Sequence, residues 1–365
     1  MRKLLIASGI YPPDIGGPAT YSSLLVKEFP KRGFVVKVLT YGPAGISRKI
    51  PKGLRHLIYF FVCLFKALYS DIIFAQNQLS AGLPAMIAAK FTGCKFIMRI
   101  PGDSVWEWAV QKYGIKDSID DFQDKKYGFK IEIRRKIQRF VANSADALIA
   151  PSIYFKRIVS RWAKNPEKVH VIYNGIELEK SIKSNTDKGK IILSAGRMVP
   201  WKGFNALVEL TTSLPDWQLI IVGDGPVKDQ LVMLINKLNL KERVKLINPM
   251  PREELLEYLA KAKIFVLNTS FESFSFQIVE AMNAGVPVIT TNIGNLSEII
   301  DNGQEGILVE PNNKRQIIEA ITRIEENDAF RETIINNAYK KAQKFSLENT
   351  MDNLEKLLKS LYATK

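Results

Sequence analysis

The chain has 365 residues, of which 46% are apolar and 24% charged; this excludes a disordered, collagen-like or low-complexity protein and is typical of two globular domains. Two cysteines and two histidines are too few for a disulfide framework or a histidine-rich metal site, and they favour a reducing compartment. The formal net charge of +15 lies entirely in the first half, because residues 1–180 hold 29 Lys and Arg against 14 Asp and Glu, whereas residues 181–365 hold 23 of each.

In chain order, short apolar runs alternate with helix-length amphipathic segments. The first run, at residues 3–8, is too short for a signal peptide and is followed at once by Tyr11-Pro12-Pro13, so we expect a buried strand there. The longest apolar segment, residues 57–69, is too short to cross a bilayer; a core helix is expected, with an interfacial helix as the alternative. The strands expected in the first half are 3–8, 34–39, 72–75, 95–100, 147–150 and 169–172.

The second half repeats the same alternation, with strands expected at 190–195, 217–222, 244–247, 264–267, 287–290 and 306–309. Continuous apolar strands between helices predict parallel sheets covered on both faces, and therefore an α/β protein with two Rossmann-like, doubly wound domains. We expect the domains at 1–176 and 177–365, joined by the polar stretch 177–190. The last helix, at about 346–363, is a candidate to pack across the interface.

Ligands of open α/β sheets bind at the carboxyl ends of the strands, so the residues that follow each strand are the candidate site. After the strand at 190–195 come Gly196 and Arg197, and then Lys202. The glycine allows a ligand to approach the backbone, and the two cations suit a diphosphate. Two solvated surface cations are the alternative. The next strand ends in Gly223-Asp224-Gly225-Pro226, which alone predicts only a tight turn.

Two glutamates follow the strand at 264–267. Glu272 would lie in the loop at the carboxyl end of the strand, and Glu280 about one turn into the next helix. One carboxylate could face a reacting sugar while the other accepts hydrogen bonds from ribose hydroxyls. Two ordinary surface glutamates are the alternative, which the apolar residues around them disfavour.

Taken in order, these motifs resemble the retaining glycosyltransferases of family GT4, which have the GT-B fold. The resemblance is carried by Gly196-Arg197 with Lys202-Gly203, by Gly223-Asp224-Gly225-Pro226, by Glu272 and Glu280-Ala281-Met282 with Gly285-Val286-Pro287-Val288, and by the N-terminal Gly16-Gly17. It implies two domains that face a central cleft. It further implies retaining transfer of a sugar, of hexosyltransferase type, from a nucleoside-diphosphate sugar to an acceptor hydroxyl in polysaccharide or glycolipid synthesis, without a metal or another cofactor.

The resemblance also implies roles for individual residues. Arg197 and Lys202 would hold the donor diphosphate, which Gly16, Gly17, Gly196 and Gly223 would allow to come close. Glu280 would bind the ribose, and Glu272 would lie at the donor sugar, with the backbone of Phe274, Ser275 and Phe276 beside it. The chain departs from the family in two places. It has Ser273-Phe274-Ser275 where the family has Gly-Phe-Gly. It also lacks the histidine that the family has in the first domain, after the fourth strand, expected here at 95–100.

The first domain is expected to bind the acceptor, a saccharide or a lipid-linked sugar. Arg99 or Asp103 could replace the absent histidine, and Glu107 could contact the acceptor. The basic segment 125–139 has an apolar stripe at helical spacing and predicts either a core-packed helix with a solvated basic face or a helix that docks on anionic lipid. We therefore expect a cytoplasmic protein with peripheral contact to the membrane. No helix-turn-helix, zinc or RNA-binding signature is present, so nucleic acid is not expected.

Two other functions stay open at this point. A nucleotide-sugar epimerase has the same fold but uses several carboxylates and histidines near the sugar, and His56 and His170 are poorly placed for that. An inactive subunit that binds a nucleotide sugar is suggested by Ser273 and Ser275. A dinucleotide-dependent dehydrogenase is excluded, because no Gly-x-Gly-x-x-Gly follows the first strand.

Overall fold

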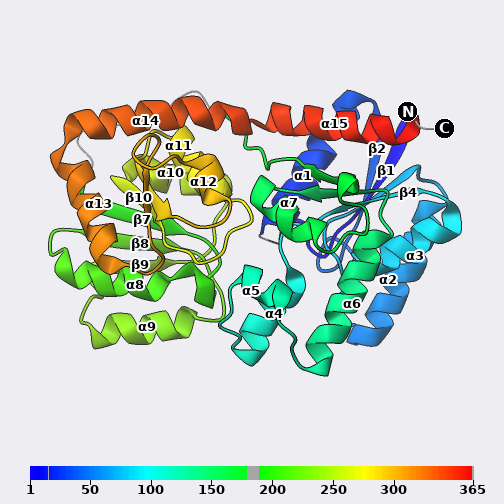
Figure 1. Cartoon of the computed structure of the whole chain (residues 1–365), viewed down its shortest axis with the longest axis horizontal. Helices are drawn as coiled ribbons and strands as arrows, with labels where there is room; N and C mark the ends of the chain where they lie inside the picture. The colour runs from blue at the N-terminus through cyan, green and yellow to red at the C-terminus, as the bar shows by residue number, and fades with distance from the viewer. Residues whose placement is uncertain (15, 179–188, 364–365) are drawn as a thin grey trace. The chain divides into compact units, whose positions relative to one another are not determined.

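The computed structural model describes residues 1–14, 16–178 and 189–363, and the chain divides into two compact units. Unit 1 consists of Met1–Asn174 with Glu348–Lys365, and unit 2 of Gly175–Leu347. The expected linker at 177–190 lies largely outside the described residues. Each unit has one six-stranded parallel sheet over those residues, with helices between the strands (Figure 1). The expected fold class, two doubly wound α/β domains, is confirmed.

The sheet of unit 1 has the order β2-β1-β3-β4-β5-β6. Its strands are β1 (Arg2–Ala7), β2 (Phe34–Leu39), β3 (Ile72–Ala75), β4 (Lys95–Arg99), β5 (Ala147–Ala150) and β6 (Val169–Val171). Its helices are α1 (Gly17–Glu28), α2 (Lys52–Ala67), α3 (Gly82–Thr92), α4 (Ser104–Tyr113), α5 (Ile119–Asp124), α6 (Phe129–Asn143) and α7 (Ile153–Ser160). Every strand lies within two residues of its expected bounds, because continuous apolar runs are a direct signal for strands buried on both faces.

The sheet of unit 2 has the order β12-β11-β10-β7-β8-β9. Its strands are β7 (Ile191–Ala195), β8 (Gln218–Val222), β9 (Val244–Ile247), β10 (Ile264–Leu267), β11 (Val288–Thr291) and β12 (Ile307–Val309). Its helices are α8 (Phe204–Leu210), α9 (Lys228–Lys237), α10 (Arg252–Lys261), α11 (Phe276–Asn283), α12 (Leu296–Ile299), α13 (Lys314–Glu326) and α14 (Asp328–Ala342). The strand order reverses between β7 and β10, and ligands of doubly wound sheets bind at such a switch point.

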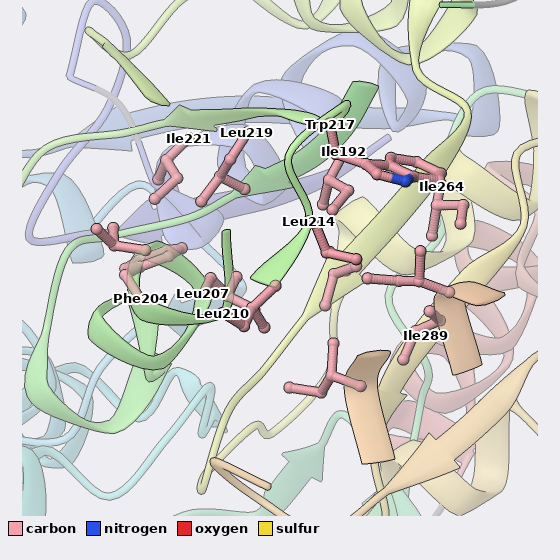
Figure 2. Packing of buried hydrophobic residues seen from close by; sticks show 14 of the residues in the cluster. Ile192, Phe204, Leu207, Leu210, Leu214, Trp217, Leu219, Ile221, Ile264 and Ile289 are labelled. Carbon is pink, nitrogen blue, oxygen red and sulfur yellow. The ribbon is translucent and has the colours of Figure 1, made fainter. Parts of the chain in front are cut away.

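A hydrophobic core beneath the sheet of unit 2 fixes the position of this switch point. Ile192 of β7, Ile264 of β10 and Ile289 of β11 point toward Leu214 and Trp217 (Figure 2). All five residues are at most 8% exposed. The two strands that meet at the switch point are thus held together by one well-packed cluster.

The last helix, α15 (Leu347–Ala363), belongs with unit 1 and not with the second domain, where the expected bounds 177–365 had placed it. Arg32 forms ion pairs with Asp352 at 2.8 Å and with Glu355 at 3.4 Å. The hydroxyl of Tyr362 donates to the carbonyl of Asp71 at 2.7 Å. These contacts join residues some 300 positions apart, so local sequence patterns did not reveal them.

Among the described residues, no helix combines the length and apolar character needed to cross a membrane. The apolar segment 57–69 forms most of α2, and only one face of this helix is buried in the core as expected. Tyr59 and Cys63 are fully buried, whereas Phe61 and Phe65 are 57% and 63% exposed. One face of the segment is therefore buried in the core and the opposite face is exposed.

Candidate functional site

The carboxyl end of β7 in unit 2 turns into a loop that carries both predicted cations. Gly196 has φ 150°, a value that residues with a side chain rarely adopt. The side chain of Lys202 lies across this glycine, because a Cβ atom placed there would be 3.7 Å from the Cε of the lysine. Lys202 is buried, and Arg197 on the same loop is exposed.

The loop after β10 holds the short 3-10 turn Pro200–Lys202 in place. The backbone N–H of Ser270 donates to the carbonyl of Trp201 at 2.8 Å, and the hydroxyl of Thr269 donates to the same carbonyl at 3.1 Å. The amide of Asn268 donates to the carbonyl of Gly203 at 2.8 Å. Gly203 has φ 54°, and an added Cβ would come within 2.4 Å of that amide. Two loops from different strands are thus joined by hydrogen bonds at the switch point.

This arrangement brings Lys202 and Glu272 together. The Nζ of Lys202 donates to Oε2 of Glu272 in an ion pair whose side chains are only 10% and 14% exposed. The two residues lie 70 positions apart in the sequence. A charge-assisted hydrogen bond in such a sheltered place fixes both side chains in one orientation.

Glu280 is the second predicted carboxylate, and it lies on α11 in a different charged pair. Its Oε1 accepts from Nε of Arg252 at 2.9 Å, and its side chain is 7% exposed. The Nη2 of Arg252 donates to the carbonyl of Glu177 at 2.8 Å. Sequence reasoning missed Arg252. The sequence does contain a signal for Arg252. A cation in the first turn of α10 interacts unfavourably with the helix dipole, so a carboxylate partner on another element is expected.

The side chains of Phe274, Ser275 and Phe276 are engaged in the fold around the start of α11. The Oγ of Ser275 accepts from the N–H of Ile278 at 3.3 Å and so caps the helix. The ring of Phe274 packs at right angles to that of Phe276, with centroids 6.0 Å apart, and also contacts Phe345. The serine that departs from the family pattern at 275 is thus a helix cap, and its buried hydroxyl points into the helix end.

Gly223 is required by close packing of the backbone. An added Cβ would lie 2.0 Å from the carbonyl oxygen of Gly196. The N–H of Gly196 in turn donates to the carbonyl of Val222 at 3.0 Å. The two glycines therefore allow the ends of β7 and β8 to meet beside the loop that carries the cations.

In unit 1, the predicted glycines lie where α1 begins. Gly16 precedes the helix with φ 148°, and Gly17 is its first residue. Within the described part of the chain, no side chain forms a cap hydrogen bond at this helix end. An uncapped helix N-terminus with a glycine before it presents backbone N–H groups that suit an anion. The role of Gly16 and Gly17 toward a diphosphate stays a prediction.

Arg99, at the end of β4, is fully buried and touches no carboxylate among the described residues. Its Nη1 donates to Oε1 of Gln76 at 3.1 Å, and its Nη2 donates to Oδ1 of Asn174 at 2.6 Å. The guanidinium lies 4.0 Å above the ring of Tyr21. Burial lowers the pKa of Arg99 to about 10. The side chain thus links the end of β4 to Gln76, which follows β3, and to Asn174. An acceptor role for Arg99 stays a prediction.

Asp103 is a structural cap of α4. It is 1% exposed, and its Oδ1 accepts from the N–H groups of Val105 and Trp106 at 3.0 and 3.1 Å. The amides of Gln123 and Gln138 donate to its two oxygens. These four hydrogen bonds stabilise the carboxylate in its buried position. Glu107 lies half-buried on the first turn of α4. Contact of either residue with an acceptor stays a prediction.

Residues 129–139 of the basic segment 125–139 lie in α6, and two of their arginines make contacts within unit 1. Arg135 is buried and donates to the carbonyls of Phe122 and Lys125. Arg134 lies 4.0 Å above the ring of Trp108. The buried Arg135 agrees with a core-packed helix, and the exposed Lys130 and Lys136 agree with its expected solvated basic face. Docking of this helix on anionic lipid stays a prediction. Within the described part of the chain, no three His, Cys, Asp or Glu side chains cluster as metal ligands would.

Two doubly wound α/β units, one of which has a sheltered lysine–glutamate pair at its switch point, define the class of GT-B glycosyltransferase folds. Two family models match the chain: "Glycosyltransferase Family 4" over residues 15–180 and "Glycosyl transferases group 1" over residues 176–341. The chain belongs to this GT4-type family of GT-B glycosyltransferases, as its motifs had indicated, and it is a transferase.

Relatives and solved structures agree with this family. The uncharacterized glycosyltransferase MJ1178 of Methanocaldococcus jannaschii is 29% identical over 99% of both chains. The N-acetylgalactosamine-N,N'-diacetylbacillosaminyl-diphospho-undecaprenol 4-alpha-N-acetylgalactosaminyltransferase of Campylobacter jejuni is 31% identical over 52% of this chain and 53% of its own. Sucrose-phosphate synthase from Thermosynechococcus elongatus has the same fold, with a TM-score of 0.83, 21% identity and full coverage of both chains. HepE of Anabaena matches with a TM-score of 0.78 and 20% identity, over 99% of this chain and all of its own.

Proposed function

We propose that this protein transfers a sugar from a nucleoside-diphosphate sugar to an acceptor hydroxyl, with retention of the configuration at the anomeric carbon. The observation that carries the proposal is the Lys202–Glu272 pair at the switch point of unit 2, with Arg197 on the same loop. The structure of HepE, which shares the fold, was determined in complex with UDP-glucose. Relatives that transfer amino sugars support the same class of reaction.

The chemistry assigned to these residues is electrostatic. A lysine ammonium has three N–H donors, so Lys202 can keep its bond to Glu272 and still donate to a diphosphate oxygen. Glu272 fixes the lysine before the donor arrives, so that the cation is already oriented when negative charge develops on the leaving group. Arg197 supplies a second cation, and Glu280, oriented by Arg252, would accept from the ribose hydroxyls.

In the transfer step, the bond between the anomeric carbon and the diphosphate oxygen breaks, and its electron pair leaves with the nucleoside diphosphate. The acceptor oxygen bonds to the same face of that carbon, and its proton passes to an oxygen of the leaving phosphate. Because Lys202 and Arg197 provide the positive charge that this leaving group needs, we propose that no metal or other cofactor takes part. The acceptor would be a saccharide or a lipid-linked sugar of polysaccharide or glycolipid synthesis.

A panel of nucleoside-diphosphate sugars tested by thermal shift, followed by transfer assays in EDTA, examines this function. A cognate donor at 100 times its Kd adds about 2.7 kcal/mol to stability. Nuclear magnetic resonance of the product then gives its anomeric configuration. Isomerisation of the donor without an acceptor would point instead to an epimerase. Binding of the donor without transfer across a broad acceptor panel would point to an inactive binding subunit. Inversion of configuration or a loss of activity in EDTA would refute the corresponding part of the proposal.

A further inference from the structure

Helix α2 of unit 1 has large apolar side chains on two opposite faces. Tyr59, Cys63 and Ala67 form its buried face and are at most 1% exposed. The opposite face, together with the two residues that follow the helix, carries six apolar residues that are each between 52% and 64% exposed. These six, called here the α2 stripe, are Leu54, Leu57, Phe61, Phe65, Leu68 and Tyr69. A helix that is apolar on both faces is ordinarily enclosed on both sides, by protein or by lipid.

The helices next to α2 also carry exposed aromatic side chains. Helix α3 contacts both α2 and α6, and the three lie on the same side of unit 1 (Figure 1). Phe91, at the end of α3, is 76% exposed. Phe140 of α6 is also exposed, and the ammonium of Lys90 lies 5.0 Å above its ring. A contiguous apolar surface on a globular protein marks an interaction site.

The charge around the stripe identifies the partner. Residues 29–102, which include α2 and α3, hold eleven Lys and Arg against one acidic residue, Asp71. Of these cations, Lys31, Arg32, Arg48 and Lys95 form ion pairs with carboxylates outside this range, and Arg99 is buried. The carboxylate of Asp71 already accepts from the backbone N–H of Lys3 at 2.7 Å. Lys49, which precedes α2 by three residues, and Lys90 of α3 are both exposed. Exposed aromatic and leucine side chains together with exposed lysines are the combination that binds an anionic lipid surface.

We propose that the α2 stripe inserts into the headgroup–acyl boundary of an anionic bilayer, with the surrounding lysines in contact with lipid phosphates. Binding of this face to the same face of a second copy is disfavoured, because a symmetric dimer would bring the two sets of cations together. The proposal goes beyond sugar transfer and does not depend on it. The proposed docking helix also differs from the sequence-based expectation, which placed lipid contact on the segment 125–139, whereas the α2 stripe lies on α2 and the two residues that follow it.

Vesicle flotation with the full chain tests the proposal, with the double variant Phe61→Ser/Phe65→Ser as the probe. Both side chains are exposed, so the variant should fold, and an unchanged melting temperature and donor-binding affinity verify this. We expect wild type to float with vesicles that contain phosphatidylglycerol, and the variant to bind them about tenfold or more weakly. Val232→Ser/Met233→Ser, a change of two exposed apolar residues on α9 of unit 2, is the matched control and should bind like wild type.

Three results would overturn the proposal. Wild type could fail to float with anionic vesicles, or bind neutral phosphatidylcholine vesicles equally well. The Phe61→Ser/Phe65→Ser variant could float like the Val232→Ser/Met233→Ser control. Sedimentation could show that wild type is a dimer and the Phe61→Ser/Phe65→Ser variant a monomer, while neither binds vesicles. The α2 stripe would then be a protein interface. Because donor binding is measured separately on each variant, none of these results bears on the proposed transferase function.

Discussion

Replacement of Lys202 by methionine separates the structural role of its ion pair from its role toward a diphosphate. Removal of one partner of a buried pair costs about 3–5 kcal/mol, because the remaining charge is left without compensation. The side chains of Lys202 and Glu272 are 10% and 14% exposed, so water screens part of this cost. We therefore expect Lys202→Met to destabilise unit 2 by about 2–3 kcal/mol, a fall of about 4–12 °C in melting temperature for a domain of this size. Loss of the cation should also slow turnover by about 100- to 1000-fold.

The double variant Lys202→Met/Glu272→Gln makes the test decisive. It removes both charges of the pair, so we expect most of the lost stability to return while turnover stays low. Calorimetry and steady-state transfer rates measure the two effects on the same preparations. Our assignment would be refuted by a Lys202→Met enzyme within threefold of wild-type turnover, or by recovery of turnover in the double variant. Either result would mean that the pair only stabilises the loop.

Three further predictions concern residues around this site and in unit 1. Arg252→Ala removes the guanidinium that pairs with the carboxylate of Glu280. We expect thermal melts to show a loss of about 2 kcal/mol in stability, and calorimetry to show weaker donor binding. The control Arg315→Ala, in an exposed ion pair, should change stability by less than about 0.5 kcal/mol. Gly203→Ala places a Cβ at φ 54° within 2.4 Å of an amide nitrogen, so urea unfolding should show a loss of more than about 1 kcal/mol, and unchanged stability would contradict the geometry. Burial raises the pKa of the Cys63 thiol to about 12, so it should resist alkylation at pH 8 in the native protein and react only on unfolding, as counted by mass spectrometry.

The strands were predictable from the sequence, and several functional assignments were not, for physical reasons that differ from element to element. In a strand as apolar as β10, all side chains are buried only if the sheet is covered on both faces. Helix α2 is equally apolar, but periodicity cannot tell which of its faces the protein covers. The ion pairs of Arg32 with α15 and of Arg252 with Glu280 depend on contacts between distant segments. The charge of α6 was visible in the sequence, but the carbonyls that accept from Arg135 were not.

The predicted donor site also shows why order and spacing of motifs were informative when no single motif was. Lys202 and Glu272 follow β7 and β10, which are neighbours only because the sheet order reverses there. The parallel register, with Ile192 opposite Ile264, sets the two strand ends at the same edge. A chain with both residues but another strand order would separate them by one or more strands, each about 4.8 Å wide. The cation and the carboxylate therefore form one site only if the whole sheet has this topology. For this reason, a sequence that has all the motifs in order predicts the fold as well as the chemistry.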